Sequence, residues 1–375
     1  MTPENTPGLR ARTAAALRLE ASRVPQLTAF VGLDGFVDEI LDVVDKRQDV
    51  ANYQRMPTIA SLGERISGAA GRSTNIELVT RRTKLGGNGP IMANALASFG
   101  LNTTYVGSLG FPNLHPVFSE FAQRAKVISI SEPGHTDALE FEDGKLMLGK
   151  MYPLAEVNWE NLNARAGAEN VRNQVLQSTF IAFVNWTMLP HMSAIWERML
   201  AEIVPTLTGE RRWMFFDLAD PAKRTREDLL HALELVHQFN TKFKVILGLN
   251  EKEAFEVGEV LGLPMPDGSP DGLGCLTQRI AEKVAVETIV VHPVTYALAV
   301  TDGQASMVSG PRIQKALITT GAGDHFNAGF CLGKLLGLDD AASVLTGVTT
   351  SGYYVKTATT PGMLDLAGMM DNWPS

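Results

Sequence analysis

The segment from Thr319 to Phe330 holds the side chains and spacing best suited to chemistry in this chain. It reads Thr-Thr-Gly-Ala-Gly-Asp-His-Phe-Asn-Ala-Gly-Phe. Gly321 and Gly323 allow a tight turn whose backbone N–H groups point in one direction. Phe326 and Phe330 recur at helical spacing, so we expect a helix to begin near Asp324. A glycine turn that opens a helix binds anions, because free amides and the helix dipole both favour negative charge.

An aspartate at the start of such a helix predicts phosphoryl transfer. The Asp324 carboxylate can accept a proton from a hydroxyl, while the amides of Ala322, Gly323 and Asp324 hold a phosphoryl group. Phosphoryl transfer requires little more than this positioning and charge stabilisation. The alternative is a purely structural role, because Asp is a good N-cap and glycines often precede helices.

The longer string decides between these interpretations. Thr320 to Phe330 resembles the C-terminal signature of the ribokinase-like (PfkB) carbohydrate kinases. The resemblance implies that Gly321, Ala322 and Gly323 form an anion hole and that Asp324 is the catalytic base. It also implies ATP and Mg²⁺ as cofactors. The family landmarks occur in the family's order over roughly residues 28–358.

Substrate contacts are also implied by the resemblance. The segment Leu85-Gly-Gly-Asn-Gly-Pro-Ile-Met-Ala93 is similar to the family's N-terminal signature, which assigns Gly86, Gly87 and Asn88 to the substrate site. A strand-end acid that holds sugar hydroxyls corresponds to Asp38, or to Asp34. The alternative is that these two acids lie in a loop and bind nothing.

The nucleotide side is less distinctive. Asn250-Glu-Lys-Glu253 matches an Asn-x-x-Glu that lies near magnesium and phosphates in the family, with Glu253 acting on Mg²⁺ through water. The same residues also predict a capping box for a helix at 251–261. The resemblance further places His292 and Thr320 at the nucleotide.

Three positions depart from the family pattern. Ile318 replaces an Asp that helps to form a monovalent-cation site in several members, which leaves potassium dependence open. Ile91 stands where an Asn often contacts the sugar. The segment Val290–Ala297 lacks the usual glycine turn, so the adenine side is expected to be built differently.

Apolar strands alternate with helical segments from residue 178 onward, which predicts an α/β fold with a mostly parallel central sheet and helices on both faces. Strands are expected at 180–184, 213–217, 244–247 and 288–291. Short alternating segments at 126–151 predict a small antiparallel sheet with one wet face. We therefore expect a single ribokinase-like domain over 1–375, with a β-sheet lid formed by residues near 38–55 and 103–152.

The net charge of −8 excludes a nucleic-acid binder, because that function needs clustered Lys and Arg. No apolar run approaches the length that spans a bilayer, so we expect a cytoplasmic protein that does not bind membranes. The expected partner is a small sugar or sugar-like substrate, and a homodimer through the lid is an open alternative. Two other functions are left open, a nucleoside kinase on the same fold and a catalytically weak binding or regulatory protein.

Overall fold

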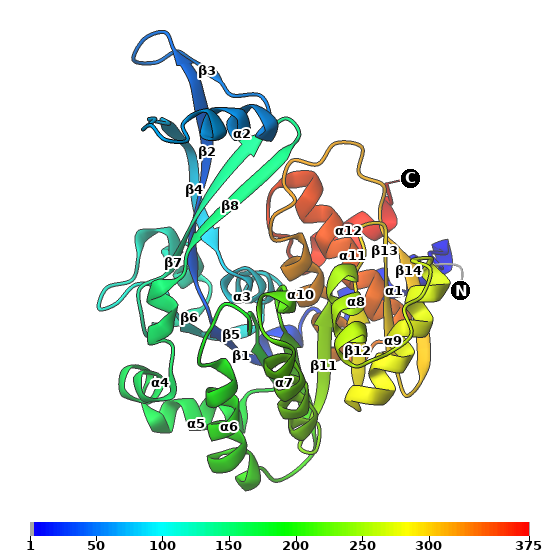
Figure 1. Cartoon of the computed structure of the whole chain (residues 1–375). Helices are drawn as coiled ribbons and strands as arrows, with labels where there is room; N and C mark the ends of the chain where they lie inside the picture. Colours follow the sequence, from blue (N-terminus) through cyan, green and yellow to red (C-terminus); the bar gives the residue numbers. More distant parts are fainter. Residues whose placement is uncertain (1–3, 375) are drawn as a thin grey trace.

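The computed structural model describes residues 4–374, so the first three residues and Ser375 of the predicted domain lie outside it. Within that range, nine strands form a large sheet in the order β14-β13-β12-β11-β10-β9-β1-β5-β6. A smaller sheet projects from one side of this body (Figure 1). The strands of the large sheet are β1 (Thr28–Leu33), β5 (Asn102–Gly107), β6 (Lys126–Ser129), β9 (Phe180–Phe183), β10 (Arg212–Asp217), β11 (Phe243–Leu249), β12 (Thr288–Val291), β13 (Tyr296–Thr301) and β14 (Gln304–Ser309).

The large sheet is mostly parallel, as predicted. Every neighbouring pair from β6 to β12 is parallel, and only β13 and β14 at one edge are antiparallel. The strand β9 is buried at all four positions. Such continuous apolar runs are typical of parallel strands that are covered on both faces.

Helices cover both faces of the large sheet. In β9, Ile181 and Phe183 pack into one core, whereas Phe180 and Ala182 pack into the other, because successive side chains alternate across a strand. The first core is covered by α4 (Trp159–Ala166), α5 (Ala168–Gln177), α6 (Met192–Glu202), α7 (Arg226–Phe239), α8 (Glu251–Val260) and α9 (Pro270–Val284). The second is covered by α1 (Pro7–Glu20), α3 (Asn88–Ser98), α10 (Ala322–Leu335), α11 (Asp340–Thr357) and α12 (Met363–Asp371). None of the described helices is both long and apolar enough to cross a membrane.

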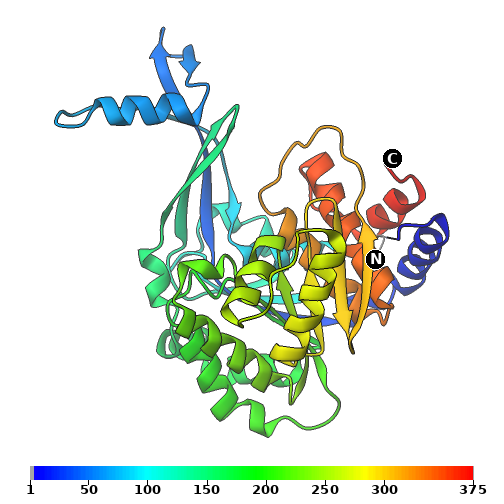
Figure 2. The same ribbon diagram turned by 45° about the vertical axis from the view of Figure 1, so that its right-hand side comes forward.

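The small sheet extends away from the body (Figure 2). Its strands run in the order β3-β2-β7-β8, and β4 pairs with β2. They are β2 (Phe36–Arg47), β3 (Tyr53–Arg55), β4 (Leu78–Gly86), β7 (Gly134–Phe141) and β8 (Gly144–Lys150), with α2 (Ile59–Gly68) at the outer end. A separate apolar cluster that includes Leu41, Leu62 and Leu139 joins α2 to the strands.

The predicted lid boundaries need correction at two places. Strands β5 and β6 lie in the predicted range 103–152, but they pair in parallel with the large sheet. Strand β4 belongs to the small sheet although the predicted range omits it. The side-chain pattern of a short strand does not reveal which sheet the strand joins. Its pairing partner is determined by distant parts of the chain.

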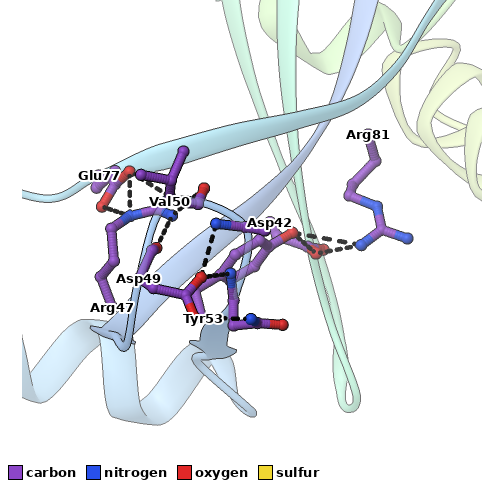
Figure 3. A network of polar contacts seen from close by, with 9 residues as sticks. Asp42, Arg47, Asp49, Val50, Tyr53, Glu77 and Arg81 are labelled. Atoms are coloured by element: carbon purple, nitrogen blue, oxygen red, sulfur yellow. Dashed lines mark hydrogen bonds and ion pairs between the residues drawn. The ribbon is translucent and has the colours of Figure 1, made fainter.

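A polar network holds the outer end of the small sheet (Figure 3). Tyr53 donates from its hydroxyl to Asp42 at 2.9 Å, and Arg81 lies 3.3 Å from the same carboxylate. Arg47 binds Glu77 through two guanidinium nitrogens. The Arg47–Glu77 pair is partly solvent-exposed and therefore contributes little to stability, whereas Asp42 is buried and has its carboxylate bound by Tyr53 and Arg81.

Two helices begin at the candidate site, and the first of them, α10, starts slightly earlier than expected. Helix α10 begins at Ala322, two residues before Asp324, and α3 begins at Asn88 and contains Pro90 in its first turn. The predicted capping box at the start of α8 is confirmed, because Asn250 and Glu253 each accept from the other's backbone N–H.

Candidate active site

The glycine turn before α10 presents free amides to one side. Gly321 is the N-cap residue and has a φ of 94°, a conformation that favours glycine. The Ala322 N–H donates to the Thr319 carbonyl at 3.1 Å. The amides of Gly323 and Asp324 have no hydrogen-bond acceptor within residues 4–374. Two free amides at the positive end of a helix dipole make this turn suited to binding an anion.

Asp324 lies in the first turn of α10 and is 8% exposed. Burial raises the pKa of its carboxyl well above the ordinary value, and the nearby charge of Asp217 raises it further. The Asn88 side-chain amide donates to Asp324 Oδ1 at 2.9 Å and lowers this pKa. Such a carboxylate takes up a proton more readily than an exposed aspartate, which suits a general base.

The glycine pair before α3 brings two acids close to the backbone. A Cβ at Gly86 would lie 2.4 Å from the Asp38 carboxylate. One at Gly87, where φ is 91°, would lie 2.9 Å from Asp34 Oδ2. Asn88 begins the helix and points its side chain at Asp324. The predicted residues of both signatures therefore converge on one place.

Asp34 has the environment of a structural anchor. It is fully buried and accepts hydrogen bonds from the backbone of Asn88 at 3.0 Å and Gly89 at 2.8 Å, and from the Asn185 side chain at 2.7 Å. The Tyr105 hydroxyl donates to its carbonyl at 2.6 Å. Burial outweighs these bonds and raises the pKa of Asp34 to about 6. Because its oxygens already have partners, it is less available to a substrate than Asp38.

Asp38 has fewer partners. It lies on β2 beside Lys84 of β4, whose Nζ is 3.8 Å from Asp38 Oδ2. Burial raises the pKa of Asp38, and the Lys84 charge opposes this shift, as does a hydrogen bond from Thr136. This carboxylate keeps acceptor capacity for hydroxyl groups, which distinguishes it from Asp34.

Two lysines of the small sheet belong to this group, although the sequence did not single them out. Lys145 of β8 donates from Nζ to Thr320 Oγ1 at 2.7 Å, directly before the glycine turn. The positive charge of Lys84 lowers the pKa of both Asp38 and Asp324. No local pattern marks either residue, because their position depends on how the small sheet sits over the turn.

A second pair of buried acids consists of Asp217, the last residue of β10, and Glu253 in the first turn of α8, which follows β11. Asp217 accepts from Asn327 Nδ2 at 2.9 Å, and the Ala219 N–H near its carboxylate lowers its pKa, but Asp217 Oδ1 has no hydrogen-bond partner of good geometry within the described chain. Burial raises its pKa well above normal, and the charge of Glu253 adds to the shift. Glu253 accepts from the backbone of Asn250 at 2.8 Å and of Asp220 at 2.7 Å. The unpaired Asp217 oxygen and the hard carboxylate donors fit a hydrated Mg²⁺.

Asp217 could have been found from the sequence. It is the last residue of an apolar strand, and ligands of open α/β sheets bind beyond the carboxyl ends of the strands.

His292 follows strand β12 and lies against the glycine turn, since a Cβ at Gly323 would approach His292 Cε1 to 3.0 Å. Burial lowers the pKa of His292 to about 4, so the ring is neutral. A side chain at Gly323 would therefore crowd His292, whereas the positive φ occurs at Gly321.

Comparison with known proteins assigns this arrangement to a family. The family model for prokaryotic ketohexokinase matches residues 9–373. The chain belongs to this family. It is therefore an ATP-dependent carbohydrate kinase, as the sequence predicted. A ketohexokinase of Haloferax volcanii is 28% identical over 332 residues, which cover 88% of this chain and 87% of that protein.

Solved structures support the ribokinase-like fold. A carbohydrate kinase from Agrobacterium tumefaciens superimposes with a TM-score of 0.62 at 16% identity, covering 93% of this chain and 98% of that one. A ribokinase from Thermotoga maritima gives 0.60 at 14% identity, with coverages of 92% and 99%. Phosphofructokinase-2 from Escherichia coli gives 0.61 at 14% identity and the same coverages.

Proposed function

We propose that this kinase transfers the γ-phosphoryl group of ATP to a hydroxyl of a ketohexose, with Asp324 as the general base. The ketohexose is proposed from the family and from the activity of the Haloferax relative. The observation that carries the mechanism is the position of Asp324. Its carboxylate and the free amides of Gly323 and Asp324 occupy the same helix start, opposite Asn88.

In this mechanism the sugar oxygen attacks the γ-phosphorus. The bond from that phosphorus to the bridging oxygen of ADP breaks, and the hydroxyl proton passes to Asp324. The amides of Gly323 and Asp324 stabilise the transferring group together with the positive end of α10. Asp38 accepts hydrogen bonds from other sugar hydroxyls, and Lys84 and Lys145 offset the negative charge that ATP adds to these acids.

We propose that the small sheet acts as a lid over the sugar. Asp38, Lys84 and Lys145 all lie on its strands, so the sheet contributes side chains to the same space as the glycine turn. A homodimer through this lid stays a prediction, which the exposed side chains of Met147 and Leu148 on β8 support.

Mg²⁺ would enter with ATP and be held through its water shell near Asp217 and Glu253. When bound, it would neutralise phosphate charge. Magnesium dehydrates reluctantly, so few direct protein ligands are needed. Asp217 and Glu253 would orient the water molecules, and Asn327 would fix the Asp217 carboxylate as it does in the protein alone.

We expect Glu253→Gln to raise the Mg²⁺ concentration needed for half-maximal activity about ten-fold or more, because outer-shell carboxylates tune metal affinity. The amide has one acceptor oxygen, so either Asn250 N–H or Asp220 N–H loses its partner. The free energy of unfolding should therefore fall by about 1–3 kcal/mol. A magnesium titration and a denaturant titration separate the two effects. Lower stability with an unchanged magnesium titration would leave Glu253 as a helix cap only.

The function is tested by measuring ADP formation with Mg²⁺ and ATP over ketohexoses, aldohexoses, pentoses and nucleosides. We expect the highest kcat/KM with a ketohexose. A preference for nucleosides would indicate the nucleoside kinase alternative, and turnover with none of these acceptors would indicate a binding or regulatory protein. Asp339→Asn is a suitable control protein, because Asp339 caps α11 far from the turn.

A further inference from the structure

The carbonyl side of the glycine turn is held by two aromatic side chains. His325 Nδ1 lies 2.7 Å from the Gly321 carbonyl, and the Tyr354 hydroxyl donates to the Thr320 carbonyl at 3.1 Å. The two rings stack on each other with centroids 3.7 Å apart and planes at 13°. Peptide groups are planar, so fixing these carbonyls also fixes the direction in which α10 starts. The two hydrogen bonds to the carbonyls therefore also orient the amides of Gly323 and Asp324, which face the phosphoryl group in the proposed mechanism.

The hydrogen-bond roles of His325 follow from its partners. A carbonyl oxygen only accepts, so Nδ1 carries the proton that binds Gly321. Burial lowers the pKa of His325 to about 4, so the ring is neutral and Nε2 is an acceptor. Thr360 Oγ1, 3.1 Å from Nε2, is therefore the donor to the ring.

The same chain of hydrogen bonds continues to the surface. Asn94 of α3 donates from Nδ2 to Thr360 Oγ1 at 3.3 Å, and Arg124 donates to Asn94 Oδ1 at 3.1 Å. These residues line a groove of about 790 Å³ beside the turn. Asn94 and Asn88 lie on the same helix, so this chain links the helix that contacts Asp324 to the back of the glycine turn.

We propose that His325, oriented by Thr360 and stacked on Tyr354, is a positioning residue that fixes the glycine turn for phosphoryl transfer. The proposal rests on the proposed role of that turn. His325 does not act as a base, because its proton faces the Gly321 carbonyl and its lone pair faces Thr360. Tyr354 and Thr360, which contact the ring, are neutral, and the charge of Lys84 on the small sheet lowers the pKa of His325 further.

Thr360 offers the matched test, because Thr360→Val removes the hydroxyl and keeps the shape, whereas Thr360→Ser keeps the hydroxyl. We expect Thr360→Val to lower kcat about five-fold, the effect of losing one hydrogen bond, with the sugar KM changed less than two-fold. Thr360→Ser should stay within about two-fold of the unmodified enzyme in both values. An unchanged kcat in Thr360→Val, or equal losses in both variants, would overturn the proposal.

A double variant tests whether the effect passes through the imidazole. The amide nitrogen of Asn in His325→Asn can replace Nδ1, but the side chain is too short to reach Thr360. Adding Thr360→Val to His325→Asn should therefore lower kcat little further. A full five-fold additional loss would overturn the proposal. The Asp324→Asn variant tests the proposed function separately. If that variant kept normal turnover, Asp324 would not be the base, but the kcat values of the two Thr360 variants would still show whether the glycine turn depends on His325.

Discussion

The Asp324→Asn variant is expected to lose about 10²- to 10⁴-fold in kcat while it retains ATP affinity. Asparagine keeps the shape of the side chain, and its oxygen can still accept from Asn88 Nδ2. It cannot take up the hydroxyl proton, so the chemical step loses its base. Steady-state kinetics with a verified sugar, together with ATP titration by calorimetry, measure both quantities.

Asp339→Asn is the control for this variant. Asp339 also stands at a helix start and accepts from the Ala342 N–H at 2.8 Å, but it lies outside the site. Its turnover should match that of the unmodified enzyme. If Asp324→Asn kept near-normal turnover, Asp324 would be a structural residue and the proposed mechanism would be wrong.

The second large effect is expected at Asp38. Asp38→Asn should weaken the apparent sugar affinity about ten-fold or more, because losing a charged hydrogen-bond partner costs about 1.5–3 kcal/mol. The affinity for ATP should change little, since Asp38 lies on β2 of the small sheet and not at the glycine turn. The measurement is the sugar KM at saturating ATP, followed by the ATP KM at saturating sugar.

Asp42→Asn provides the matched control on the same strand. Asp42 belongs to the network at the outer end of the small sheet, where it binds Tyr53 and Arg81 (Figure 3). Its substitution should leave the sugar KM unchanged. Equal losses of sugar and ATP affinity in Asp38→Asn would instead indicate a structural role for Asp38.

The sequence predicted the parts of the site that local rules determine. The turn and helix at Gly321–Asp324 and the capping box at Asn250–Glu253 depend on residues within a few positions of one another. The same holds for the buried strands of the large sheet, whose apolar runs are continuous. The α/β class follows from their alternation with helices.

The remaining features depend on contacts between distant segments. Lys145 and Thr320 are 175 residues apart in the chain, yet they share a hydrogen bond. The strand at 126–129 pairs with β5 in the large sheet and was predicted in the lid. The sequence also could not distinguish Asp34 from Asp38. Asp34 receives hydrogen bonds from Asn185 and Tyr105, which are distant in the chain, whereas Asp38 keeps free acceptor capacity.

The buried acids of the site imply a trade between conformational stability and function. Burial raises the pKa values of Asp34, Asp217, Glu253 and Asp324. A carboxyl whose pKa is higher in the folded protein binds more protons when folded, so the free energy of unfolding falls as pH rises through that pKa. For Asp34 this window lies between the ordinary value of 3.8 and about 6.

We therefore expect the ligand-free protein to melt at a higher temperature near pH 5 than near pH 7, because Asp34 loses its bound proton between these values. Exposed acids such as Asp49 and Glu77, whose pKa values are lowered by hydrogen bonds, lose their contribution only at lower pH. Thermal melts at the two pH values measure the effect, and a higher melting temperature near pH 7 would contradict it. The cluster of buried carboxylates therefore lowers the free energy of unfolding of the ligand-free protein. Binding of cations and substrate completes the site and raises that free energy again, because these ligands bind only the folded state.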